Sequence, residues 1–382
     1  MSTSIGTMVI SAMLISATAS AIALPVAPNA SQVTVGAVPV PAAGPVPIER
    51  SAGPVAAANL RPLEAAATRG DAKAESALAE FFLSRKDYPG GLLWATKAAL
   101  QGYGPAEVSL GRCYLNGLGV PKNYALALKW FRRASSQGSA TADDCIGRIY
   151  ENGWGVPRDY VVAARWYTIA ATKGDADAQD HLGFQYTFGL AMRLDYRKAV
   201  KWFRMAAAQG DATGEAELGS MYVLGLGTPR DRAKALFWCR KSAALGNGAG
   251  EDGLGMLYFT GQGVPRNYGV AMRYFKQAAA HGESQAMYNL GHMYAHGLGV
   301  SPNLYKAKAW FQRAVDAGDK QAKREVRTVA YLIDINFIIK LFAVLGVAGG
   351  IWLVWRWLRK RRTASQQAKL AAIVNRAWDA GG

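Results

Sequence analysis

Two histidines have a spacing that could bind a metal ion. His292 and His296 lie four residues apart in a segment with helical periodicity, so both side chains could face one ion. A zinc site needs further ligands, and no Asp, Glu or Cys occurs at a matching spacing. The equivalent positions of two earlier segments hold Arg112 and Asn116, and Arg148 and Asn152. We therefore expect ordinary surface residues, and the sequence predicts no metal site.

One glycine-rich segment matches a nucleotide-binding motif in form only. Residues 248–253 read G-x-G-x-x-G, but a dinucleotide fingerprint follows a β-strand, whereas this segment crosses a turn and enters an expected helix. The sequence also lacks S-x-x-K, K-T-G, G-x-S-x-G and H-E-x-x-H motifs and a phosphate-binding loop. We predict no enzymatic activity and no cofactor.

Three cysteines in 382 residues exclude a disulfide-rich scaffold. Cys239 takes a position that is aromatic in neighbouring segments, which predicts a buried free thiol. Cys113 and Cys145 occur on neighbouring expected helices and could form a disulfide in an oxidising compartment. Their side chains would have to point at each other between helix axes about 8–10 Å apart. Both a disulfide and two free thiols remain open from the sequence.

The N-terminal segment has the composition of an export signal followed by a tether. Residues 1–48 contain no Asp, Glu, Lys or Arg, and an apolar run leads into Ala21-Ile22-Ala23, which fits a signal-peptide cleavage site. We predict a signal peptide over residues 1–23, although no Lys or Arg precedes the apolar run. Residues 24–58 are rich in Pro and Ala and predict a flexible tether.

The C-terminal segment has the pattern of a membrane anchor. Residues 335–355 are almost wholly apolar and would span about 31 Å as a helix, close to one hydrocarbon core. Gly346 and Gly350 have a spacing that could let two such helices pack as a homodimer. Residues 356–382 begin with a basic cluster, which favours a cytoplasmic tail, and end in a short amphipathic pattern.

The charge balance points to membranes rather than to nucleic acid. The chain has 44 Lys and Arg against 27 Asp and Glu, a formal net charge of +17, and the tail contributes +6 of this excess through seven Lys and Arg against one Asp. We expect the tail to contact anionic lipid headgroups, and we predict no nucleic-acid partner. Hydrophobic residues make up 51% of the chain, which excludes wholesale disorder.

Three columns of residues recur every 36 residues through the middle of the chain. The first is the glycine of a Leu-Gly-x-x-Tyr motif, at Gly111, Gly147, Gly183, Gly219, Gly255 and Gly291. The second is aromatic, at Trp94, Trp130, Trp166, Trp202, Trp238, Tyr274 and Trp310. The third is glycine, at Gly102, Gly138, Gly174, Gly210, Gly246, Gly282 and Gly318. A fixed period of this length predicts an all-α, α-α superhelical solenoid of about seven helix-turn-helix repeats over residues 59–333.

Each repeat reads as two helices. Leu110 and Tyr114 lie on one face of the first helix, and the glycine at position 117 permits the positive φ that ends it. Asn123 stands where a capping side chain would start the second helix. Trp130 is expected to fill the seam between neighbouring repeats as a core residue.

The order A-x-x-x-L-G-x-x-Y-x-x-G-x-G-V-P-x-N…A-x-x-W-F-x-x-A-x-x-x-G resembles the Sel-1-like repeat family, which is related to tetratricopeptide repeats. Residues 106–138 match this order nearly position for position, and the resemblance covers about residues 62–333. Members of the family are typically interaction scaffolds. Bacterial members are often exported and act in envelope complexes, including secretion, polysaccharide export and its regulation.

The resemblance and the two ends together imply a membrane-anchored scaffold. We expect a single-pass protein of the bacterial inner membrane, with periplasmic repeats that bind other envelope or membrane proteins and with a cytoplasmic tail. Side chains on the first helices that the repeat does not dictate are the predicted contacts: Arg112, Asn116, Arg148, Asn152, His181 and Gln185.

Two alternatives remain. The missing basic residues before the apolar run favour a cytoplasmic adaptor that is inserted by its C-terminal helix. A hydrolase acting on cell-wall or β-lactam substrates rests on family analogy alone, because some cysteine-rich relatives have been described in those terms.

Overall fold

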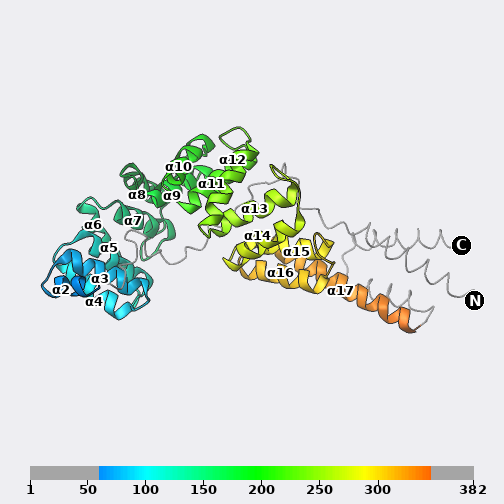
Figure 1. The fold of residues 1–382 in the computed structure, drawn as a ribbon, viewed down its shortest axis with the longest axis horizontal. Helices are drawn as coiled ribbons and strands as arrows, with labels where there is room; N and C mark the ends of the chain where they lie inside the picture. Colours follow the sequence, from blue (N-terminus) through cyan, green and yellow to red (C-terminus); the bar gives the residue numbers. More distant parts are fainter. Residues whose placement is uncertain (1–59, 346–382) are drawn as a thin grey trace, which may run out of the picture. The chain divides into compact units, whose positions relative to one another are not determined.

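The computed structural model describes residues 60–345, and these residues form sixteen helices without a β-strand (Figure 1). Residues 60–286 and 287–345 form separate compact units, so each is described by itself. The predicted signal peptide, the tether, the tail and Gly346 and Gly350 lie outside the described residues. Of the predicted membrane span, only its first part, up to Leu345, is described.

Seven pairs of helices confirm the predicted repeats, and every helix in these pairs has 13 residues. The first helices are α3 (Ala72–Ser84), α5 (Gly104–Asn116), α7 (Ala140–Asn152), α9 (Ala176–Phe188), α11 (Ala212–Leu224), α13 (Gly248–Thr260) and α15 (Ser284–His296). The second helices are α4 (Tyr88–Leu100), α6 (Tyr124–Ser136), α8 (Tyr160–Thr172), α10 (Tyr196–Ala208), α12 (Arg232–Ala244), α14 (Tyr268–Ala280) and α16 (Leu304–Asp316). A short helix, α2 (Leu60–Thr68), precedes them, and α17 (Ala322–Leu345) follows them.

The helix ends form as the sequence predicts. Gly117 ends α5 with a φ of +74°, a left-handed conformation that side chains other than glycine rarely adopt. The Asn123 side chain accepts a hydrogen bond from the Leu126 amide at 3.0 Å and so caps α6. Asp195 caps α10 in the same way, through the Lys198 amide. These local signals fix where each helix begins and ends before any repeat packs on the next.

The fully buried aromatic column is not the tryptophan column. Phe131, Phe203 and Phe275 have no exposed surface, whereas the tryptophans that precede the first two are only half-buried. Trp166 still packs against a core cluster built from α5, α6 and α7, which confirms its place at the seam between repeats. The prediction that this column forms the core was wrong, because the ring that follows each of these tryptophans is fully buried, whereas the tryptophans are only partly buried and pack against the core of the preceding repeat.

Within residues 60–286, the first helices approach one another more closely than the second helices do. The pairs α3 and α5, α9 and α11, and α11 and α13 are in direct contact, and no pair of second helices in this unit packs comparably. Small residues on the first helices permit this approach. The second helices of successive repeats make less contact with one another.

In the unit of residues 287–345, α16 packs on α17, and the ring of Phe311 is buried. His292 is only 3% exposed and lies 5.1 Å from the Phe311 ring and 4.5 Å from the Tyr288 ring. The expectation that His292 is a surface residue was wrong, because these rings enclose it. His296 is exposed, as expected.

Helix α17 runs without a break for 24 residues, from a segment in the position of a first helix to the limit of the described residues. No helix between residues 60 and 345 is long and apolar enough to cross a bilayer.

Candidate partner-binding faces of the repeats

The six predicted contact residues lie at different depths. Asn116, Arg148, Asn152 and His181 are partly exposed on α5, α7 and α9. Gln185 has no exposed surface. Arg112 is 5% exposed. Neighbouring first helices cover the side chains of Gln185 and Arg112. Neither side chain is therefore accessible to a partner in this structure.

The structure brings Arg148, His181 and Gln185 together around one buried carboxylate, Glu151. The Tyr167 hydroxyl donates to Glu151 Oε2 at 2.8 Å, and Gln185 Nε2 donates to Glu151 Oε1 at 3.5 Å. The His181 ring stacks on the Tyr167 ring with centroids 4.7 Å apart. Arg148 is close enough to act electrostatically on Glu151 and on His181. Asn152 donates to the Arg148 carbonyl on its own helix.

Burial dominates the protonation of this cluster. It raises the pKa of Glu151, and the hydrogen bonds from Tyr167 and Gln185 only partly oppose it. Burial, aided by the positive charge of Arg148, lowers the pKa of His181 to about 3, so the ring is neutral at pH 7. The pKa of Tyr167 is raised well above its ordinary value by burial and by the adjacent Glu151. A neutral imidazole and a phenol of raised pKa suit hydrogen bonding better than catalysis.

Carboxylates surround this cluster on the first helices. Asp144 is 3% exposed, its Oδ1 atom has no hydrogen-bond partner, and His181 Nε2 is 3.7 Å away. Burial raises the pKa of Asp180 well above its ordinary value, and the carboxylates of Asp211, Glu217 and Asp177 raise it further. Residues 60–286 place only three cations on the first helices, Lys73, Arg112 and Arg148, whereas each of these helices carries Asp or Glu. We call the surface formed by the first helices α3, α5, α7, α9, α11 and α13 the acidic face.

A series of buried polar residues ties each first helix to the end of its second helix. Glu107 accepts hydrogen bonds from Gln137 at 2.9 Å and pairs with Arg133 at 3.0 Å. One repeat later, Asp143 pairs with Lys173 at 2.6 Å. In two later repeats the same position holds Glu215, which pairs with Lys241, and Glu251, whose carboxylate lies 2.8 Å from His281 Nδ1. Sequence reasoning missed this column, although its recurrence every 36 residues could have revealed it.

The three cysteines are buried free thiols. Cys239 is therefore as predicted, and the disulfide between Cys113 and Cys145 is not formed. Cys145 belongs to an apolar core cluster with Phe131, and the nearby Arg112 acts electrostatically on its sulfur. Burial raises the pKa of Cys113 and of Cys145 to about 12, so neither thiol ionises readily.

The described residues contain no group of three or more His, Cys, Asp or Glu side chains that could hold a metal ion. The G-x-G-x-x-G segment forms the first turns of α13, where Asn247 caps the helix at the Gly250 amide. A β-carbon on Gly250 would clash with the Ser242 hydroxyl, so this glycine permits close helix packing.

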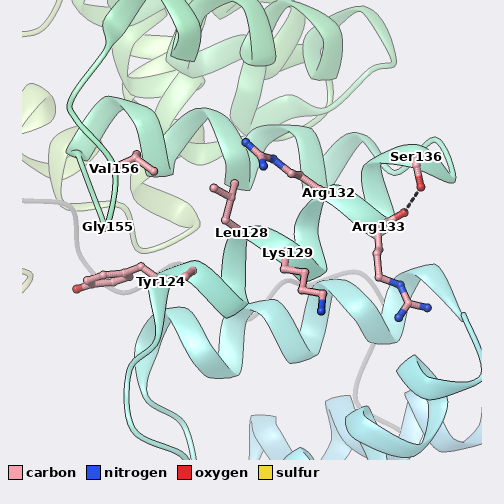
Figure 2. A pocket seen from close by; sticks show the side chains of 9 residues that line it. Tyr124, Leu128, Lys129, Arg132, Arg133, Ser136, Gly155 and Val156 are labelled. Atoms are coloured by element: carbon pink, nitrogen blue, oxygen red, sulfur yellow. Dashed lines mark hydrogen bonds between the residues drawn. The ribbon is translucent and has the colours of Figure 1, made fainter.

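A pocket opens on the other side of the repeats, between α6 and the loop before α8 (Figure 2). Its volume is about 520 Å³. Tyr124, Leu128 and Val156 supply apolar wall, and Lys129 and Arg132 supply positive charge. Arg132 also donates to the Tyr150 hydroxyl at 3.2 Å. Three cations line this pocket when Arg133 is included, and none of its lining residues is acidic.

The repeats match a known family over most of the chain. The Sel1 repeat matches residues 72–103, 104–139, 146–175, 176–211, 212–247, 250–283 and 284–319. No protein of curated function matches the chain.

Two solved structures are similar to it. The first is c5321, a protective antigen of uropathogenic Escherichia coli strains displaying an SLR fold, at 30% identity over 85% of this chain and 72% of that one, with a TM-score of 0.56. The second is a Sel1 repeat protein from Oxalobacter formigenes, at 29% identity over 63% of this chain and 96% of that one, with a TM-score of 0.57. The chain therefore belongs to the Sel1 repeat family.

Proposed function

We propose that this chain is a membrane-anchored adaptor whose exported repeats hold another envelope protein, in secretion, polysaccharide export or its regulation. The Sel1 repeats supply a protein-protein interaction scaffold. Three sequence features support the anchor and the orientation: residues 1–23, the apolar residues 335–355 and the basic tail that follows them. The mechanism is binding, and the acidic face is the surface that presents itself to the partner.

The observation that carries this proposal is the polar cluster around Glu151. Other repeats place Leu115, Val223 or Phe259 at the same position, so the repeat does not require a carboxylate there. Burying charged and polar groups costs stability, and such groups persist where another role retains them. Arg148 and His181 bring this cluster to the surface on α7 and α9.

Charge reversal tests the face. Arg148→Glu should weaken capture of the partner from detergent-solubilised native membranes by roughly ten-fold, the effect of losing about 1.4 kcal/mol of binding free energy. A melting curve checks that the variant folds, because Arg148 also acts electrostatically on the buried Glu151. Arg165→Glu on α8 is the matched control, since Arg165 is exposed on a second helix. Equal capture by both variants would remove the acidic face from the proposal.

A topology reporter tests export separately. Alkaline phosphatase, which is active only outside the cytoplasm, is fused near residue 60 of the full chain. Activity supports exported repeats, and inactivity supports the cytoplasmic, tail-anchored alternative. Extraction of the full chain from membranes by salt alone would contradict the anchor in both forms.

A further inference from the structure

The exposed sides of the second helices carry one sign of charge. None of the second helices within residues 60–286 contains Asp or Glu, and each contains Lys or Arg. Exposed cations recur at equivalent positions of successive repeats. We call the following six residues the cationic face: Lys129 and Arg132 on α6, Lys201 and Arg204 on α10, and Arg240 and Lys241 on α12.

Most of this charge is not neutralised by a carboxylate. Arg132, Arg204 and Arg240 donate to the hydroxyls of Tyr150, Tyr222 and Tyr258, at 3.2, 3.4 and 3.5 Å. Among the residues that the structure describes, Lys241 is the one of these six that forms an ion pair, with Glu215 at 2.9 Å. The tyrosine contacts hold the guanidinium groups in place without reducing their charge, so a positive surface faces solvent.

Apolar and aromatic side chains lie among these cations. Leu93, Ile169 and Phe237 on the second helices are 53%, 42% and 54% exposed. The half-buried tryptophans stand next to cations. Arg133 lies 4.9 Å from the centroid of the Trp130 ring, and the Lys241 ammonium lies 5.0 Å from that of Trp238. Cations beside aromatic and aliphatic side chains are typical of surfaces that lie in a membrane interface.

The pocket on α6 belongs to this surface. Lys129 and Arg132 of the cationic face line it together with Tyr124, Ser136 and Val156 (Figure 2). Tyr124 and Val156 lie at one end of the helix, and Arg133 and Ser136 lie at the other. A volume of about 520 Å³ exceeds that of a phosphate group and is in the range of small-ligand pockets. The cations can pair with a phosphodiester, and the apolar wall suits the glycerol carbons beside it.

We propose that the cationic face lies against anionic lipid headgroups of a bilayer, and that the pocket on α6 takes one phosphate-bearing headgroup. Charge complementarity gives the attraction, and the exposed Leu93, Ile169 and Phe237 enter the interface. The aliphatic side chains favour lipid over nucleic acid, because Leu and Ile neither stack on bases nor hydrogen-bond to their edges. This contact goes beyond the proposed adaptor function, since it uses the second helices and leaves the acidic face free for the partner.

Lysine labelling of the full chain tests the contact directly. The chain is reconstituted into nanodiscs of phosphatidylcholine alone, or of phosphatidylcholine with phosphatidylglycerol. Acetylation by a limiting active ester is then followed by mass spectrometry at each lysine. Phosphatidylglycerol should slow the modification of Lys129 and Lys201 by at least about three-fold, and 1 M salt should remove this protection because it shortens the Debye length to about 3 Å. Lys73, exposed on the first helix α3, is the internal control and should react equally in both discs.

Paired variants separate a specific surface from net charge. Lys129→Glu with Lys201→Glu should abolish most of the lipid-dependent protection of Lys276, an exposed lysine on α14. Arg69→Glu with Lys73→Glu changes the net charge equally and should leave that protection intact. Circular dichroism melts confirm that both variants fold. Equal loss of protection in the two variants, or no lipid dependence in the parent chain, would overturn the proposal.

Competing ligands complete the test. An oligonucleotide, polyglutamate or millimolar inorganic phosphate, added to discs of phosphatidylcholine alone, should not protect Lys129. Protection equal to that given by phosphatidylglycerol would overturn the lipid assignment in favour of a general anion surface. The anchor is judged independently: a chain that does not stay in the discs contradicts the proposed span, and the same labelling with added vesicles then tests the cationic face alone.

Discussion

Gly111 and Phe131 are in contact across the two helices of one repeat, so closely that a β-carbon on Gly111 would lie 2.6 Å from a ring carbon of Phe131. The same contact joins Gly147 to Tyr167 and Gly183 to Phe203, at 2.6 and 2.5 Å. The glycine of the Leu-Gly-x-x-Tyr motif is therefore required by packing, because the ring occupies the place of its side chain. In these three pairs of helices, this contact limits how closely the two helices approach.

A methyl group at this contact should be costly. Gly183→Ala forces the β-carbon into the Phe203 ring and should destabilise the fold by about 1–3 kcal/mol, the usual cost of overpacking. Gly269→Ala is the matched control. Its β-carbon would meet only the Asn267 side chain at 3.4 Å, and alanine favours a helix, so we expect no loss of stability. Chemical denaturation of both variants measures the difference, and similar losses would contradict the packing account.

The two aromatic columns should differ in their energetic weight. Phe203→Ala removes a ring with no exposed surface and should cost about 3–5 kcal/mol. Trp202→Ala, one residue earlier, removes a half-buried ring and should cost clearly less. Urea denaturation of the two variants at one temperature compares them. A larger loss for the tryptophan would restore it as the core residue.

Helices, caps and turns could be predicted from the sequence because they depend on local signals. Asn123, Gly117 and the spacing of Leu110 and Tyr114 identify them without knowledge of the neighbours. The buried ring could not be chosen in this way, because Trp202 and Phe203 are adjacent and periodicity places both towards the core. The signal that decides between them is Gly183, because the Phe203 ring occupies the place where its side chain would be.

The candidate site was less predictable than the fold. Gln185 and Arg112 stand at positions that the repeat does not dictate, which suggested exposure, but the neighbouring first helices bury both. Only the packing of successive repeats determines which side of a first helix remains at the surface. Arg148 and His181 lie at the edge of the region that neighbouring first helices cover, so both remain partly exposed.

Glu217 should make a contribution to stability that is lost as the pH rises from 5 to 8. Burial, with the nearby Glu283, raises the pKa of Glu217 to about 7 from a usual value of 4.5. Between these values the folded chain keeps a proton that the unfolded chain has lost, so stability decreases with rising pH. Glu217→Gln should therefore gain stability relative to the parent chain at pH 8 and show little gain at pH 5. Melting curves at the two pH values check this, and a gain confined to pH 5 would reverse the sign.

The pair formed by the buried Asp143 and Lys173 should be sensitive to loss of one partner. The Asp143 side chain has no exposed surface, and in Lys173→Met its carboxylate would keep only the hydrogen bond from the Ser135 hydroxyl. This loss should lower the free energy of unfolding by about 1–3 kcal/mol. Adding Asp143→Asn should recover part of this loss, because the neutral amide costs less to bury. A double-mutant cycle measures the coupling, and strictly additive effects would show that the pair does not matter.

The thiols should be unreactive in the folded chain. Burial raises the pKa of Cys239 to about 12, as it does for Cys113 and Cys145, so little thiolate exists at neutral pH. Iodoacetamide should not modify the native chain within an hour, and unfolding without reductant should expose three reactive thiols. Modification of a single thiol until reductant is added would indicate a disulfide instead.

Binding of another protein by the acidic face is the basis of the proposed adaptor function. A photo-crosslinking residue placed at position 181 in the full chain, in its native membrane, tests this claim most directly. We predict one dominant protein adduct, which Arg148→Glu removes and which the same residue at position 168, exposed on α8, does not form. No adduct from position 181, or an identical adduct from position 168, would contradict it.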